Sequence, residues 1–372
     1  MQSRSSSYDC LQCLRAFGAL GVFASHLALK ASVLGGARLP HGAGAGVYGV
    51  DIFFVVSGFI MIHSTRDKPH GIIGAGRFLL ARWARIFPPY WTVLAACLLI
   101  EGSWSGAITQ GPTASLIGSV LLFPEAASPV LRSAWTLINE SYFYAVFGVL
   151  MLAPRRWLAP ALSAWALGIL LAAASGWRPG DSVTTLFSNP LTLEFIGGAA
   201  VALFVEKLNV ALPHRALPSA VIMLSGGLMW GVLLYMSGPA DVPARVILVG
   251  LPAAGLVAAL TIVETSYSWR APRLLLWIGR RSYSLYLVNL PVCALVALLV
   301  KPLALHGAPA AGLYAASSVM AVTLTTALLY WMVERPAGVI FGRWLDRSIQ
   351  ADISVNQGGE LDNRRLILNT VP

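Results

Sequence analysis

The sequence predicts an all-α, polytopic integral membrane protein with about ten transmembrane helices and both termini in the cytoplasm. Three observations predict this fold: 57% of the 372 residues are hydrophobic, only 11% are charged, and the apolar residues are gathered into long runs. Soluble domains carry about 25% charged residues, and about 20 apolar residues suffice to cross the hydrocarbon core of a bilayer. The composition therefore excludes a soluble fold.

Ten apolar runs are the expected spanning segments, and each is expected to be a helix because a segment in lipid must satisfy its own backbone hydrogen bonds. A half-helix is also expected around 113–124, in the longest outer loop. The polar end of the chain separates a membrane domain, residues 1–345, from a flexible cytoplasmic tail, residues 346–372. The runs are 11–29, 47–65, 86–102, 136–153, 157–175, 190–207, 216–237, 245–264, 283–301 and 311–333.

The distribution of Lys and Arg between the runs predicts the orientation in the membrane. With the N-terminus inside, the cytoplasmic segments hold 19 of these residues, and the outer ends and loops hold 6. Arg15, inside the first run, completes the total of 26. This bias places both termini in the cytoplasm, and it explains the net charge of +10 without a nucleic-acid partner.

Cys10 and Cys13 form a C-x-x-C pattern at the start of the first run. A structural zinc site needs four ligands, and the chain has no second cysteine pair to complete one. The two residues are therefore expected to be small buried thiols. No metal and no permanently bound cofactor is predicted.

Ionisable side chains inside the runs are the first candidates for function, because a charge in hydrocarbon costs several kcal/mol. At 1.5 Å per residue, His26 lies about 4–5 Å from the outer end of the first run. Asp51 and Glu140 lie about 6 Å from the outer ends of their runs on the same basis. The three are therefore expected to meet near the outer surface as a catalytic cluster.

Each of these residues also has a purely structural interpretation. His26 could form only a helix-to-helix hydrogen bond, Asp51 could cap the second helix, and Glu140 could pair with a neighbouring arginine. His63, at the cytoplasmic end of the second run, is expected to be interfacial. Glu194 has no partner that the sequence identifies.

Arg82 and Arg85 stand three residues apart and share a helix face just before the third apolar run. Guanidinium groups bind phosphate through two parallel hydrogen bonds. The pair is therefore a candidate docking site for a phosphorylated cytoplasmic donor. The alternative is binding of lipid headgroups at the inner surface.

Six short motifs follow one another along residues 10–340. Each is weak alone, but their order and spacing resemble acyltransferase family 3, the membrane acyltransferases that modify bacterial polysaccharides, and most of all its exopolysaccharide acetyltransferase branch. The motifs are Leu14-Arg15-Ala16 with His26, Gly49-Val50-Asp51-Ile52-Phe53-Phe54 running on to Ser57-Gly58-Phe59, Arg82-x-x-Arg85 before Ile86-Phe87-Pro88-Pro89-Tyr90-Trp91, Trp135-Thr136-Leu137 with Glu140, Ser282-Tyr283-Ser284-Leu285-Tyr286-Leu287, and Glu334-Arg335-Pro336.

The resemblance implies ten or so helices in the bacterial inner (cytoplasmic) membrane, a cytoplasmic acyl-CoA donor, and a carbohydrate acceptor met at the membrane or its outer face. It assigns the essential histidine to His26. Arg15, about 16 Å away along the same helix, is then expected to line the path of the donor. Donor binding is also assigned to Arg82 and Arg85, with Ser57 in a small-residue turn of the second helix.

One position departs from the pattern of the family. Many members carry a histidine two positions after the Ser-Tyr-Ser-Leu-Tyr-Leu stretch, where this chain has Asn289. If that histidine takes part in proton transfer in other members, the amide of Asn289 cannot do so here. Asn289 is therefore expected only to position a neighbour through a hydrogen bond.

The predicted reaction is transfer of an acyl group to a sugar hydroxyl, with acetyl favoured through the branch resemblance. His26 is expected to act as general base, oriented or charged by Asp51 or Glu140; a covalent acyl-histidine relay is the alternative. The residues expected to contact the acceptor or to stabilise the reacting carbonyl are Trp135, Asn139, Tyr286 and Asn289, with Ser57 a further candidate for the second task.

Two other classes of function fit the composition. One is a transporter for a glycan or lipid, and the other is a non-catalytic subunit of a polysaccharide export complex. The two halves of the chain do not resemble each other, as the inverted repeats of many secondary transporters do. The lack of an internal repeat and the presence of the six motifs favour an enzyme over these two alternatives.

Overall fold

The computed structural model of the protein describes residues 8–36, 42–103, 115–125, 127–177, 179–207, 221–222, 224–226, 242–266, 270–303 and 305–344. Regular structure in these ranges is helical and includes no strand, as predicted. The longer helices are α1 (Asp9–Gly35), α2 (Gly49–Thr65), α3 (Ile72–Ser103), α5 (Trp135–Leu150), α6 (Leu158–Ala174), α8 (Thr192–Lys207), α11 (Leu251–Ser266), α13 (Ser282–Val300) and α14 (Gly307–Leu329). The shorter ones include η1 (Ala45–Tyr48), α4 (Leu116–Leu121), η2 (Arg132–Ala134), α7 (Ser182–Phe187), α10 (Val242–Arg245), η4 (Val246–Gly250), α12 (Arg273–Arg280) and η6 (Tyr330–Glu334).

Eight helical segments in the described part are long and apolar enough to cross a membrane, as expected of a polytopic membrane protein. They contain eight of the ten predicted runs. The run 136–153 forms α5, a helix of 16 residues, and the run 216–237 lies mostly outside the described residues. The tail 346–372 lies outside them altogether. The half-helix expected around 113–124 is confirmed as α4.

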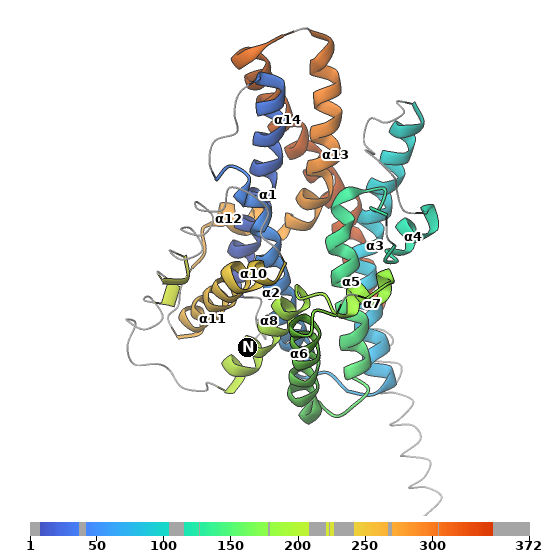
Figure 1. Ribbon diagram of the computed structural model, residues 1–372, viewed down its shortest axis with the longest axis vertical. Helices are drawn as coiled ribbons and strands as arrows, with labels where there is room; N and C mark the ends of the chain where they lie inside the picture. Colours follow the sequence, from blue (N-terminus) through green and yellow to red (C-terminus); the bar gives the residue numbers. More distant parts are fainter. Residues whose placement is uncertain are drawn as a thin grey trace, which may run out of the picture.

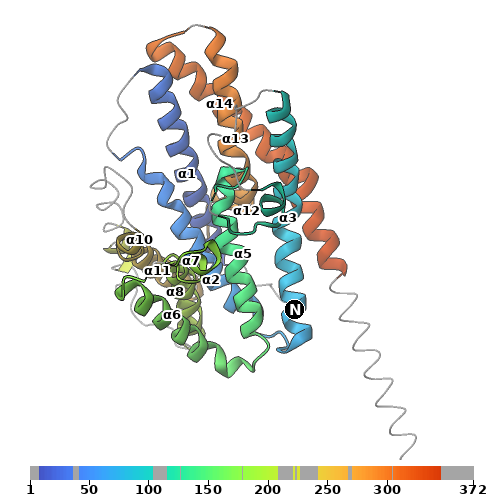
Figure 2. The ribbon, with the colours of Figure 1, turned by 45° about the vertical axis from the view of Figure 1, so that its right-hand side comes forward.

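Helix α1 is the centre of the arrangement. It packs against α12, α13 and α14, and also against η1 and α2. Figures 1 and 2 show α1, α13 and α14 side by side as the tallest part of the molecule, with α2, α6, α8 and α11 lower in both views. Helix α3 packs against α5, and α2 packs along α8. The helices α1, α2, α3, α5 and α13 thereby come together in the interior.

The structure corrects two predicted helix boundaries. Helix α1 continues to Gly35 and ends where Gly36 takes the left-handed conformation with φ 63°. His26 is therefore about 14 Å from the outer end of its helix at 1.5 Å per residue, not about 4–5 Å. The predicted run stopped before Lys30, but a lysine near a helix end can extend its charged head towards the interface without ending the helix.

Helix α3 begins at Ile72, well before the apolar run that predicted it. Arg82 and Arg85 therefore lie inside a spanning helix and not in front of it. The predicted run began only after these two charges, because hydropathy does not take into account the direction in which a side chain faces. Both guanidinium groups are turned into the protein interior.

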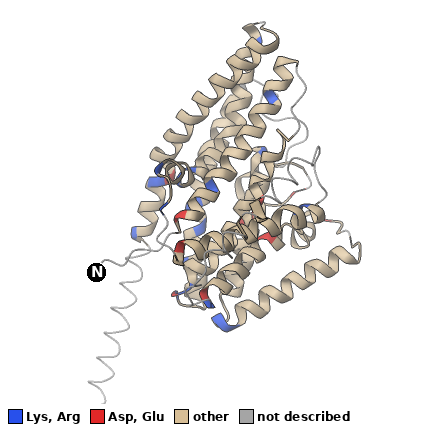
Figure 3. Cartoon of the chain, turned by 90° about the vertical axis from the view of Figure 1, so that its left-hand side faces the viewer, with Lys and Arg blue, Asp and Glu red and all other residues tan. Residues whose placement is uncertain are grey.

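The prediction of two buried thiols is confirmed, since Cys10 and Cys13 are both buried and neither forms a disulfide within the described residues. The charged segments are unevenly distributed along the molecule. Figure 3 shows most of the Lys and Arg segments in the lower half of the view and few on the upper part of the tall helices.

A very close approach between helices joins α2 and α8. A Cβ atom on Gly58 would lie 1.9 Å from the carbonyl oxygen of Phe195, and one on Gly198 would lie 1.9 Å from that of Val55. Small residues let helix backbones approach in this way within membranes, where close packing replaces the hydrophobic effect as the force between helices. This contact fixes the position of α2.

Replacing Gly58 with alanine should force α2 and α8 apart, because the added methyl group has no space beside the Phe195 carbonyl. Overpacking of this kind costs about 1–3 kcal/mol, so the melting temperature of the purified protein in detergent should fall. Gly168→Ala in α6 is the matched control, since no atom lies within 4 Å of its added Cβ. Equal melting temperatures for the two variants would contradict the close contact.

Candidate active site

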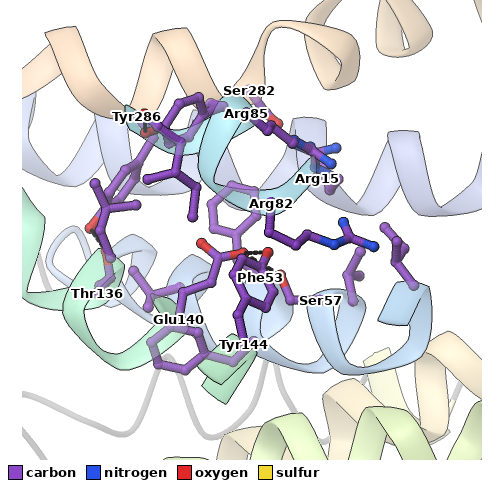
Figure 4. Close-up of a pocket in the computed structure, with 17 residues that line it drawn as sticks. Arg15, Phe53, Ser57, Arg82, Arg85, Thr136, Glu140, Tyr144, Ser282 and Tyr286 are labelled. Atoms are coloured by element: carbon purple, nitrogen blue, oxygen red, sulfur yellow. Dashed lines mark hydrogen bonds between the residues drawn. The ribbon is translucent and has the colours of Figure 1, made fainter. Parts of the chain in front are cut away.

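A pocket lies where α1, α2, α3, α5 and α13 meet (Figure 4). The side chains that line it are Arg15, Val50, Phe53, Phe54, Val56, Ser57, Ile60, Arg82, Arg85, Ile86, Thr136, Leu137, Glu140, Tyr144, Ser282, Tyr283 and Tyr286.

One end of the pocket carries three guanidinium groups, from Arg15, Arg82 and Arg85. Arg82 Nη2 donates to Ser64 Oγ at 2.7 Å, and its guanidinium carbon lies 5.5 Å from the centre of the Tyr144 ring. The lining holds three cations and one carboxylate. This end of the pocket is therefore positive and suits an anionic ligand.

The single carboxylate of the lining is Glu140. Its Oε1 accepts a hydrogen bond of 2.9 Å from Ser57 Oγ and another from the hydroxyl of Tyr144. Ser57 and Tyr144 hold this carboxylate between the arginines and the rest of the pocket (Figure 4). Pairing with a neighbouring arginine, the structural interpretation of Glu140, is not among its hydrogen bonds in the described residues.

Tyr286 and Thr136 line the other end of the pocket. Thr136 Oγ1 donates to the Tyr286 hydroxyl at 2.8 Å, and that hydroxyl donates to the Ser133 carbonyl oxygen at 3.1 Å. Thr136 is the second residue of α5, whereas Ser282 is the first residue of α13 and Arg15 lies in the second turn of α1. In the predicted orientation, Arg15 and Ser282 thus lie near the cytoplasmic ends of their helices, and Thr136 lies near the outer end of α5.

His26 lies near the Tyr286 end of the pocket, although it does not line the pocket. Its Nδ1 is 2.6 Å from Asn289 Oδ1, and Asn289 follows Tyr286 by one helical turn. Asn289 Nδ2 donates to the carbonyl oxygens of Leu285 and Tyr286, at 3.1 Å and 2.7 Å. The tertiary structure thus joins His26 to the expected positioning residue.

The two bonds of the Asn289 amide fix the tautomer of His26. Carbonyl oxygens only accept hydrogen bonds, so the amide nitrogen must be the atom that faces them and the amide oxygen must face the imidazole. The amide oxygen of Asn289 can only accept a hydrogen bond, so Nδ1 of His26 must be the donor and carry the proton. The other ring nitrogen, Nε2, then keeps its lone pair and is the basic atom of the ring.

The expected contact of His26 with Asp51 or Glu140 does not occur among the described residues. Both oxygens of Asp51 instead accept from Arg245, at 2.8 Å from Nε and 2.8 Å from Nη2. Helix α2 is preceded by Tyr48, and Asp51 does not cap it. Depths counted from run ends did not account for the true length of α1, nor for the pairing of Asp51 with Arg245.

Several polar residues surround the Asp51–Arg245 pair. The Arg245 guanidinium carbon lies 5.3 Å from the centre of the Tyr48 ring and 5.8 Å from that of Trp135. Glu194, only 2% exposed, packs against Gly250 and has Asp51 and Arg245 as its electrostatic neighbours. This pair therefore supplies the electrostatic neighbours of Glu194 that the sequence did not identify, although neither Glu194 oxygen accepts a hydrogen bond within the described residues.

Asn139 and Trp135 lie outside the pocket lining. Asn139 Nδ2 donates to the Trp135 carbonyl oxygen at 2.9 Å, and Asn139 Oδ1 accepts from Asn189 Nδ2 at 3.0 Å. These bonds use the amide of Asn139 to join α5 to the segment before α8. The Trp135 side chain is 37% exposed at the start of α5.

The pocket thus brings six of the eleven expected site residues together. Sequence reasoning did not select Tyr144, Thr136, Ser282 or Arg245 for the site. Tyr144 had a detectable signal, because it follows Glu140 by four residues and so shares its helix face. The six residues that meet in the pocket are Arg15, Ser57, Arg82, Arg85, Glu140 and Tyr286.

The family model of an acyltransferase domain matches residues 8–332 of the chain. The chain therefore belongs to this family of acyltransferases. Family, helices and pocket together define a membrane acyltransferase, and the predicted family is confirmed. The match includes every residue of the predicted site.

Individual relatives agree with this class. The chain is similar to the exopolysaccharide production protein ExoZ of Rhizobium meliloti, with 34% identity over 310 residues that span 78% of this chain and 89% of the relative. It is 27% identical over 312 residues to the acyltransferase MdmB of Streptomyces mycarofaciens, spanning 75% of this chain and 77% of MdmB. Identity to the peptidoglycan O-acetyltransferase OatA of Listeria monocytogenes is 23% over 320 residues, spanning 76% of this chain and 49% of OatA. No solved structure matches the chain.

Replacement of either Asp51 or Arg245 by alanine should destabilise the protein, because it leaves a buried charge without its partner. For buried pairs this costs about 3–5 kcal/mol, which thermal unfolding in detergent would register. The double alanine variant should lose less than the sum of the two single losses, by about 0.5–3 kcal/mol. Strict additivity would show that the pair is not coupled.

Proposed function

We propose that the protein transfers an acyl group, most favourably acetyl, from cytoplasmic acyl-CoA to a hydroxyl of a sugar in an exopolysaccharide or other cell-surface polysaccharide, or in its lipid-linked precursor. The observation that supports this most directly is the pocket, which joins three arginines at one end to Tyr286, and through Asn289 to His26, at the other. The names of ExoZ and OatA support the acceptor class.

The donor end follows from charge. Acyl-CoA carries several phosphates, and guanidinium groups bind phosphate oxygens in pairs of parallel hydrogen bonds. Arg15, Arg82 and Arg85 would hold these phosphates near the cytoplasmic half of the pocket. The thioester would then extend past Glu140 towards Tyr286. No permanently bound cofactor is part of this proposal, since acyl-CoA is a substrate.

The acceptor end follows from the tautomer of His26. In the proposed step, Nε2 takes the proton from the sugar hydroxyl while the oxygen of that hydroxyl attacks the thioester carbonyl carbon. The carbon–sulfur bond breaks, the acyl group stays on the sugar as an ester, and CoA leaves as a thiol after its sulfur takes the proton from Nε2. Asn289 positions the imidazole throughout. Tyr286 is the candidate for contact with the reacting carbonyl.

The roles of the two carboxylates change accordingly. Asp51 would hold the outer ends of the helices through Arg245, and Glu140 would balance the arginines until the donor enters. Trp135 and Asn139 would shape the acceptor side of the site. The proposal places the chain in the bacterial inner membrane with about ten helices and both termini in the cytoplasm, which the positive-inside count supports.

His26→Ala should abolish acyl transfer, because it removes the proposed base. Loss of a general base lowers rates by about 10²–10⁴-fold. The measurement is release of base-labile acetate from the polysaccharide of a deletion strain that expresses each variant, together with transfer of label from acetyl-CoA in membranes. His306→Ala, which changes an exposed histidine just before α14, is the control and should keep wild-type activity. An active His26→Ala protein would refute the mechanism.

Arg82→Ala and Arg85→Ala should each weaken binding of CoA to the purified protein by about tenfold or more, since a hydrogen bond to a charged group contributes about 1.5–3 kcal/mol. Titration calorimetry in detergent would measure the dissociation constants. Arg270→Ala, at an exposed arginine before α12, should leave CoA binding unchanged. If neither pocket variant altered the affinity for CoA, the pair would belong to lipid headgroup binding.

A further inference from the structure

One hydroxyl in the pocket has no hydrogen-bond partner. Ser282 is fully buried, its Oγ atom makes no hydrogen bond within the described part of the protein, and its side chain lines the pocket. Burial of a polar group without a partner is unfavourable. A bound ligand with an acceptor atom would remove this cost.

A neighbouring serine shows that burial on this helix does not itself leave a hydroxyl unpaired. Ser284 is equally buried, but its hydroxyl donates to the Glu334 carboxylate and its side chain does not line the pocket. Ser282 therefore differs from Ser284 in two respects that concern a ligand: its hydroxyl has no hydrogen-bond partner among the described residues, and its side chain belongs to the pocket lining.

The surroundings of Ser282 define what kind of acceptor would fit. Ser282 is the first residue of α13, a helix of 19 residues, and the start of a helix carries a partial positive charge that favours anions. Figure 4 shows Ser282 beside Arg85, on the same side of the pocket as Arg15 and away from Thr136. A donor hydroxyl between guanidinium groups and a helix N-terminus matches a phosphate rather than a neutral sugar.

We propose that Ser282 and the N-terminus of α13 complete a phosphate-binding subsite with Arg15 and Arg85, and that this subsite takes one phosphate of the acyl-CoA donor. The hydroxyl of Ser282 donates to a phosphate oxygen that the guanidinium groups also bind. This inference rests on the proposed function, since it specifies which residues hold the donor. In this proposal, α13 binds the donor at its first residue, Ser282. About two turns later, Asn289 of the same helix positions His26 on the acceptor side.

The experiment compares variants of full-length protein in detergent, with CoA and with pantetheine, the part of CoA that carries no phosphate, as probes. Ser282→Ala should weaken CoA binding about tenfold or more and leave pantetheine binding unchanged. Ser282→Thr, which keeps the hydroxyl, should bind CoA close to the wild-type affinity. The matched control Ser284→Ala should also keep it.

Ser282→Asp separates a phosphate contact from a structural role. An aspartate in the first turn of a helix is favourable for the helix, so this variant should keep the wild-type melting temperature. Its negative charge should repel a phosphate, and CoA should bind more weakly than to Ser282→Ala. Wild-type CoA affinity in either variant would overturn the subsite.

The outcomes distinguish this inference from the proposed function. If the wild-type protein itself did not bind CoA, both would fail. If the wild type bound CoA and the Ser282 variants bound it equally well, only the subsite would fail. Weaker binding of phosphatidylglycerol vesicles by Ser282→Ala, with CoA affinity unchanged, would assign the hydroxyl to a lipid headgroup and would also overturn the subsite.

Discussion

Three guanidinium groups lie in one pocket within the membrane-spanning part of the chain, and much of the surrounding structure can be understood from the need to accommodate them. Charges in hydrocarbon are tolerated only where protein or water encloses them. Helix α3 therefore turns Arg82 and Arg85 inward, where Ser64 accepts a hydrogen bond from Arg82 and the Tyr144 ring lies beside it. Glu140 supplies a single opposing charge in the lining, so one end of the pocket is positive and suits an anionic ligand.

The proposed base and the proposed anion site are separate, and α13 connects them. Its first residue lines the positive end of the pocket, Tyr286 lines the opposite end, and Asn289 holds His26 just beyond it. Side chains that are three or four residues apart lie on one face of a helix, which explains how a single helix reaches both parts of the site.

Helix α2 is fixed by two different interactions. Gly58 and Gly198 bring its backbone against α8, and Asp51 binds Arg245 near its outer end. With α2 held in this way, Ser57 can support Glu140 from a fixed position. Asp51 and Glu140, which the sequence placed in one catalytic cluster, thus belong to two separate networks, one of which positions helices while the other lines the pocket.

The sequence by itself determined the membrane class, the family and most of the helices, because hydropathy and short motifs are local properties of the chain. It also selected six residues of the pocket and Asn289. Only the tertiary structure decided that His26 pairs with Asn289, that Asp51 pairs with Arg245, and that α3 turns its arginines inward. Residues up to 263 positions apart in sequence form these contacts, and their meeting depends on which helix faces pack together, which no local pattern encodes.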